Sequence, residues 1–107
     1  MVNNSFQASI QWKPLGTING LNSLSLPSNW NELMIETEIY ISIISQYMHS
    51  VLNVNKLQIT ETDKRFDFGG GTIFITSMIS QSKLQIIQAY YKDTDYSSTA
   101  KTVVYYR

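Results

Sequence analysis

The sequence predicts an all-β fold, an antiparallel β-sandwich that is jelly-roll-like and has seven to eight short strands. The chain holds 13 Ile, 8 Leu and 5 Val but only 3 Ala. Because β-branched residues favour strands and Ala favours helices, this balance is strongly anti-helical. Many short runs also alternate apolar and polar residues, and turn residues separate them. Short strands with turn signals between them are typical of sandwiches and small barrels.

The chain length of 107 residues corresponds to one domain. Residues 1–9 are mostly polar, and we interpret them as an arm or connector before a single β-sandwich domain over residues 10–107. The first strand is expected at residues 10–13, where Pro14 and Gly16 stop it. A second is expected at residues 24–26, before Pro27.

A long strand candidate comes next. Its apolar residues fall on one face: Leu33, Ile35, Ile39, Ile41 and Ile43. Glu36, Glu38 and Ser42 fall on the other face, which indicates a half-buried strand. After it, we expect a strand at residues 47–52, a turn at residues 53–55 and another strand at residues 56–60.

The second half of the chain shows the same pattern. Phe66 and Phe68 alternate with a polar residue before three glycines at residues 69–71, which supply the positive φ angles of a tight reversal. Strands are then expected at residues 72–79 and 84–90, with Gln88 and Tyr90 on the same face as Leu84. A polar loop at residues 92–98 leads to a final strand at residues 102–107. The predicted core is Leu33, Ile35, Ile39, Ile73, Ile75, Leu84, Ile86 and Val103.

Composition excludes several classes of protein. The net charge is zero and no basic excess exists to neutralise phosphates, so we expect no nucleic-acid binding. With no cysteine, the chain has no disulfide, thiolate metal site or thiol nucleophile. The first residues lack the pattern of a secretory signal, and no apolar stretch is long enough to span a bilayer, so we expect a soluble protein made in a cytoplasm.

The candidate catalytic and metal-binding residues are few. His49 is the only histidine, and no motif places a nucleophile or an orienting carboxylate near it. Glu36 and Glu38 lie two positions apart on one strand, roughly 6–7 Å by strand rise, a separation that can serve glycoside hydrolysis. An outward-facing pair on a single strand is more typical of a solvated face. We therefore predict no catalysis and no cofactor.

Two short segments resemble ligand sites but lack essential parts. Asp93 and Asp95 alternate like the start of a calcium loop, yet the glycine and the later glutamate of such a loop are missing. Turn chemistry explains both aspartates without a metal. The three glycines at residues 69–71 are not a phosphate loop, because they open into a strand and not into a helix.

Aromatic residues are the one enriched class with a binding role to consider. Exposed rings stack against sugars, and oligomer interfaces also concentrate Tyr and Trp. The paired tyrosines at residues 90–91 and 105–106 place one ring on each face of a strand. The residues proposed as glycan or interface contacts are Trp30, Tyr91, Tyr96 and Tyr106.

Five segments together resemble a known kind of protein. They are Gln11-Trp12-Lys13-Pro14-Leu15-Gly16, Leu24-Ser25-Leu26-Pro27, Trp30-Asn31-Glu32-Leu33-Met34-Ile35, Phe68-Gly69-Gly70-Gly71 and Thr102-Val103-Val104-Tyr105-Tyr106-Arg107. Over residues 11–107 the chain resembles the small C-terminal or stand-alone β-sandwich domains of phage and prophage tail-fibre proteins of gut Firmicutes. These segments are structural landmarks, and no catalytic residue comes with them.

The resemblance implies a virion structural protein without catalysis, a tail-fibre or baseplate tip or a capsid decoration module that contributes to host adhesion. It implies a homo-oligomer, expected as a trimer, with residues 1–9 docking to other virion proteins and a host cell-surface glycan as a further partner. Assembly in the host cytoplasm would make a secretion signal unnecessary. The alternative is a monomeric carbohydrate-binding module that uses Trp30 or Tyr91 as stacking platforms.

Overall fold

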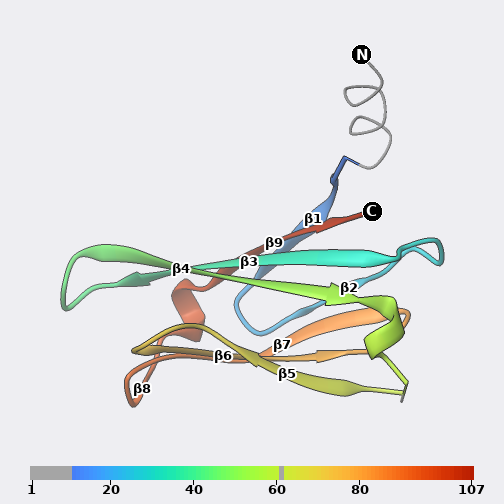
Figure 1. Cartoon of the computed structure of the whole chain (residues 1–107). Coiled ribbons are helices and arrows are strands. Elements are labelled where there is room, and N and C mark those ends of the chain that lie inside the picture. Colours follow the sequence, from blue (N-terminus) through green and yellow to red (C-terminus); the bar gives the residue numbers. More distant parts are fainter. Residues whose placement is uncertain (1–10, 61) are drawn as a thin grey trace.

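The computed structural model describes residues 11–60 and 62–107, which form two antiparallel β-sheets packed face to face (Figure 1). The first sheet, sheet A, contains in order across it β1 (Lys13–Asn19), β9 (Lys101–Tyr106), β3 (Glu32–Ile41) and β4 (Gln46–Asn55). The second, sheet B, contains β2 (Ser23–Ser25), β7 (Lys83–Tyr91), β6 (Ile73–Ile79) and β5 (Lys64–Phe68), and β8 (Thr94–Asp95) pairs with β7. The predicted all-β sandwich is confirmed. The predicted arm, residues 1–9, lies outside the described residues.

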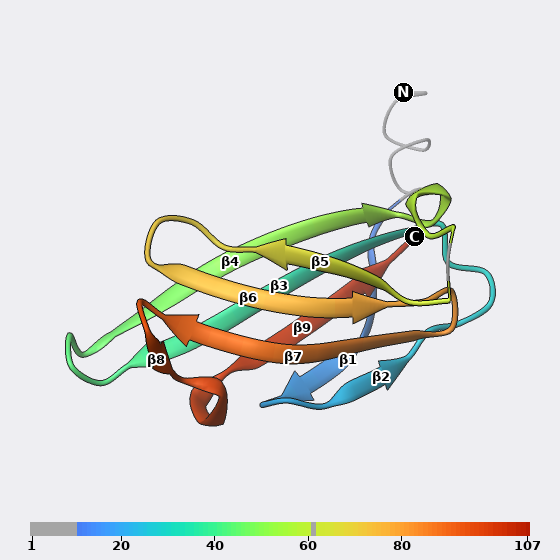
Figure 2. The same cartoon turned by 90° about the horizontal axis from the view of Figure 1, so that it is seen from below.

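Strand β3 follows the predicted alternation along its whole length. Every second side chain from Leu33 to Ile41 is buried, while Glu36 and Glu38 point outward. The strand ends at Ile41, so the expected continuation of the apolar face to Ile43 is wrong: this side chain lies in the turn and is 72% exposed. The hairpin of β3 and β4 projects past the end of sheet B (Figures 1 and 2).

The predicted turn at residues 53–55 is wrong, because β4 runs on to Asn55 in register with β3. The predicted strand at residues 56–60 is wrong as well, because a 3-10 turn, η1 (Lys56–Gln58), takes its place. Asn55 caps this turn: its Oδ1 accepts from the Leu57 N–H at 2.9 Å, and its own N–H donates to Gln58 Oε1 at 2.7 Å. Side-chain capping by Asn55 therefore stabilises a turn in a segment whose alternating sequence predicted a strand.

The first described strand begins where the sequence predicted an end. Strand β1 contains Pro14 and Gly16, and its register with β9 shifts between these two residues. Proline is tolerated here because β1 is an edge strand and its pairing with β9 is irregular at this point. A Cβ on Gly16 would lie 3.0 Å from Leu24 Cδ1. The absence of a side chain at Gly16 therefore lets Leu24 of β2, in the other sheet, pack against β1.

The three glycines form the predicted reversal between β5 and β6. Gly69 and Gly71 adopt positive φ angles of 131° and 64°. Strand β7 then departs from simple alternation, because Ile86 pairs with Ser77 while Gln88 pairs with Thr76. Ile87 is therefore an additional, bulged residue, and it exchanges the two faces of the strand beyond it. The prediction that Gln88 and Tyr90 lie on the same face as Leu84 is wrong for this reason.

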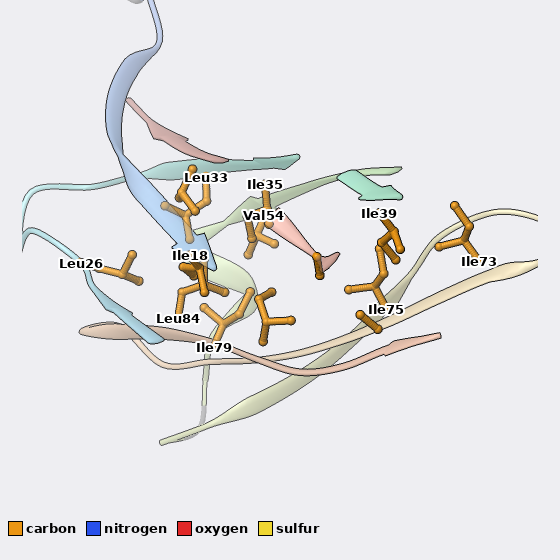
Figure 3. Packing of buried hydrophobic residues seen from close by; sticks show 14 of the residues in the cluster. Ile18, Leu26, Leu33, Ile35, Ile39, Val54, Ile73, Ile75, Ile79 and Leu84 are labelled. Carbon is orange, nitrogen blue, oxygen red and sulfur yellow. The ribbon is translucent and has the colours of Figure 1, made fainter. Parts of the chain in front are cut away.

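The core fills the space between the sheets (Figure 3). Seven of the eight predicted core residues are buried, and the eighth prediction, Val103, is wrong by one position. Val104 is fully buried in its place, because it pairs with Ile35 in the register of β9 with β3. No helix among the described residues is long and apolar enough to cross a membrane.

Candidate functional site

Two of the proposed contact residues, Trp30 and Tyr91, belong to the core. Trp30 has no exposed surface, and its indole Nε1 donates to the Gln81 carbonyl oxygen at 2.7 Å. This bond ties the loop before β3 to the turn between β6 and β7. Tyr91 is 8% exposed. Neither ring presents a face to solvent, so the prediction of a stacking platform at Trp30 or Tyr91 is wrong.

Tyr96 and Tyr106, the other two proposed contacts, are half-buried. The Tyr96 ring packs edge-on against Tyr91, with centroids 6.1 Å apart and an interplanar angle of 83°. Tyr106 packs against the core from the end of β9, with Lys13 Nζ 5.8 Å from its ring centroid. A role for these two residues in an interface stays a prediction.

The outward members of the two tyrosine pairs are Tyr90 and Tyr105. For β9 this follows from simple alternation, but for β7 it follows from the bulge at Ile87. Tyr90 lies opposite Phe74 of β6 on the outer face of sheet B. Neither Phe74 nor Tyr90 is among the contact residues predicted from the sequence. The alternation of Phe74 with the buried Ile73 and Ile75 is the signal that could have placed Phe74 outward.

Phe74 and Tyr90 line a shallow hollow of about 220 Å³ together with Gln88 and Lys92. Phe74 is 40% exposed, although it lies in the middle of a sheet. Gln88 is held in place by Thr76, whose Oγ1 donates to Gln88 Oε1 at 3.1 Å. We call this hollow the Phe74–Tyr90 pocket.

A larger hollow, of about 420 Å³, lies at the end of sheet A where β1 begins. Arg107 dominates it: its Nε lies 2.8 Å from Glu32 Oε1, and its guanidinium carbon lies 4.2 Å from the centre of the Trp12 ring. Asn55 and Gln58, which also line it, are engaged in capping η1. The functional groups here hold the end of the sandwich together.

The outer face of sheet A carries the carboxylates weighed as a catalytic pair. Glu38 lies opposite His49 in register, and the His49 Nε2 atom is 3.9 Å from Glu38 Oε1. Both side chains are open to solvent. Val51 and Val103 flank Glu36 on the neighbouring strands. The two glutamates therefore lie on an open sheet face.

The loop of Asp93 and Asp95 is organised by hydrogen bonds within the chain. Asp95 Oδ1 accepts from the Ser97 N–H at 2.8 Å, and this bond lowers the pKa of the Asp95 carboxyl. A second 3-10 turn, η2 (Ser97–Thr99), follows directly. Across residues 11–60 and 62–107, no group of three or more histidine or carboxylate side chains is placed to hold a metal ion.

Comparisons with protein-family models, with curated proteins and with solved structures found no match for this chain.

Proposed function

We propose that the chain is a non-catalytic structural module of a phage virion, a tail-fibre or baseplate tip or a decoration module that contributes to host-surface adhesion. The resemblance carried by residues 11–107 supports this role. The arrangement of the sandwich agrees with it, because packed side chains fill the interior and the groups open to other molecules lie on the outer faces. Such a domain acts through its surface.

The observation that carries the proposal is a group of exposed apolar side chains at the projecting end of sheet A. We call this group the hairpin patch, and it consists of the exposed Ile43, Ile44 and Tyr47 together with the half-buried Tyr40. The Tyr40 and Tyr47 rings pack against each other with centroids 4.9 Å apart. Ile43 is 72% exposed and Tyr47 is 60% exposed.

Gathered apolar side chains at the surface mark sites of interaction with other proteins. The hairpin patch contributes little to the core of its own chain, because the turn lies beyond the end of sheet B (Figure 1). We propose that copies of the chain cover one another's patches and form a trimer. Three hairpins brought together would also explain why this end of the sandwich carries isoleucine in a turn.

The test is the solution mass of the purified protein, measured by light scattering coupled to size exclusion. We expect a mass three times the chain mass of 12.3 kDa. The double variant I43S/Y47S should be monomeric. Its urea midpoint of unfolding should be similar to that of the unmodified chain measured as a monomer, because both side chains are exposed in the single chain.

Leu57→Ser is the matched control. Leu57 is 87% exposed, yet it lies in η1 at the opposite end of β4. This variant should keep the mass of the unmodified chain. A monomer for the unmodified chain, or a trimer that survives I43S/Y47S, would contradict the proposed assembly.

A further inference from the structure

The Phe74–Tyr90 pocket lies on the outer face of sheet B and has a composition that the fold does not require. Phe74 and Tyr90 are directly opposite on β6 and β7, a register that places their Cβ atoms about 5 Å apart. Side chains on this face make no contribution to the core between the sheets. Two adjacent rings on an outer face therefore form a small apolar platform open to solvent.

Two polar side chains, Gln88 and Lys92, border this platform, and Gln88 is held in place before any ligand arrives. Thr76 is fully buried, and its hydroxyl contacts Gln88 Oε1 at 3.1 Å as well as the Asp67 carboxylate on β5, so it holds the oxygen end of the Gln88 amide and not the amide nitrogen. No described residue accepts a hydrogen bond from that nitrogen. Lys92 also lines the pocket, while its Nζ lies 5.6 Å from the centre of the ring of Tyr91, which packs on the inner side of β7.

A ring platform beside the Gln88 amide suits a ligand with one apolar face and one polar edge. A pyranose has this character, because its C–H groups stack against aromatic rings while its hydroxyl groups accept from amide and ammonium donors. The volume of about 220 Å³ lies below the range of roughly 300–1,000 Å³ typical of drug-sized ligands, so it accommodates a single ring.

The charge around the pocket favours a neutral sugar over an anion. Lys92 is followed by Asp93 and then by Asp95, so the turn after β7 carries no excess of positive charge. Recognition of a phosphate or an acidic sugar normally uses a cluster of cations. We propose that the Phe74–Tyr90 pocket binds one neutral hexopyranose unit of a glycan.

This inference deepens the proposed adhesion role, on which its biological meaning rests, and is independent of the oligomeric state. It places the contact on Phe74, Gln88, Tyr90 and Lys92, on the sheet opposite the hairpin patch. A copy bound at the hairpin patch and a sugar bound at the pocket would therefore occupy different sheets.

The test is a titration of the ¹⁵N-labelled protein with methyl glycosides of glucose, galactose, mannose and N-acetylglucosamine, followed by NMR. We expect millimolar binding of at least one glycoside, with shifts of the Gln88 side-chain amide and of backbone amides near Phe74 and Tyr90. Phe74→Ala and Tyr90→Ala should each weaken this binding about tenfold, because each removes one half of the stacking surface.

Tyr105→Ala is the matched control, because Tyr105 is an outward aromatic on β9 of sheet A, outside both the pocket and the hairpin patch, and its loss should leave sugar binding unchanged. Inorganic phosphate serves as the anionic probe. Absence of binding by all four glycosides, binding that survives both ring variants, or phosphate shifts at the same amides would each overturn the inference. A trimer that binds no sugar would contradict the sugar site but not the proposed assembly. A monomer that binds sugar would contradict the assembly but not the sugar site, and would favour a carbohydrate-binding module.

Discussion

Thr37 on β3 and Thr102 on β9 face each other inside the sandwich, with their hydroxyl oxygens 2.9 Å apart. Both side chains are buried among the isoleucines and valines of sheet A. Each hydroxyl is the hydrogen-bond partner of the other. No buried side-chain nitrogen or oxygen of the described residues lacks such a partner.

Replacing one threonine by valine should destabilise the protein, whereas replacing both should be nearly neutral. Thr37→Val or Thr102→Val keeps the side-chain shape but leaves the other buried hydroxyl without a hydrogen-bond partner, which should lower the free energy of unfolding by about 1–3 kcal/mol. The double variant contains neither hydroxyl, so no buried polar group is left without a partner. Urea unfolding of the three variants measures the free energies of unfolding, and costs that simply add in the double variant would show that the two hydroxyls are not coupled.

Gly69→Ala should be far more costly than Gly70→Ala. Gly69 has a φ of 131°, and a Cβ built on it would lie 2.3 Å from the Ile73 carbonyl oxygen. Backbone strain and this clash together should cost at least about 2 kcal/mol of unfolding free energy. Gly70 has no atom within 4 Å of its Cβ position and lacks a positive φ, so it is the matched control. Equal melting temperatures for the two variants would contradict the geometry of this turn.

Trp30→Phe should lower the unfolding free energy by about 1–3 kcal/mol, because it opens a cavity and leaves the Gln81 carbonyl without its indole donor. Trp12 is the other tryptophan and is half-exposed, so Trp12→Phe is the spectroscopic control. Fluorescence of the Trp12→Phe protein should peak at shorter wavelength than that of Trp30→Phe. The opposite order would contradict the burial of Trp30.

Asp67→Asn should destabilise the protein at neutral pH but not in acid. The Arg65 guanidinium, whose Nε donates to Asp67 Oδ1 at 3.0 Å, lowers the pKa of the Asp67 carboxyl in the folded state. A lowered folded pKa contributes stability above the unfolded pKa of about 3.9, and this contribution disappears as the pH falls through the folded value. Because both side chains are largely exposed, the effect at pH 7 should be only about 0.2–1 kcal/mol.

Urea unfolding of Asp67→Asn and of the unmodified protein at several pH values would measure this difference in the free energy of unfolding. Arg65→Gln should reproduce it, and the double variant should add little. A difference that grows toward low pH would have the wrong sign for this ion pair.

The fold class could be predicted because composition and alternation are local properties of the chain. The inward and outward faces predicted for β3 agree with the structure from Leu33 to Ile41, because this strand pairs in regular register with a partner on each side. The bulge at Ile87 could not be predicted, because it depends on how β7 meets β6 and not on the sequence of β7 alone. That one residue decides whether Tyr90 or Tyr91 faces solvent.

The same limit explains the errors in the candidate site. The burial of Trp30 depends on Gln81, a partner 51 positions away that completes its hydrogen bond. Phe74 alternates with Ile73 and Ile75 and so could be placed outward, but its neighbour across the sheet could not be identified without the register. Pairing between strands, and not residue type, assembled the pocket.

The pairing of β1 with β9 has a mechanical consequence. Lys13 lies opposite Tyr106, at the end of sheet A far from the β3–β4 turn. A force that pulls these two residues apart would open the hydrogen bonds between their strands one pair at a time, as a zipper opens. A force directed from Lys13 toward the β3–β4 turn runs along the strands, perpendicular to those bonds, and loads many of them together in shear. The sandwich should therefore resist tension along its strands far better than tension across its edge.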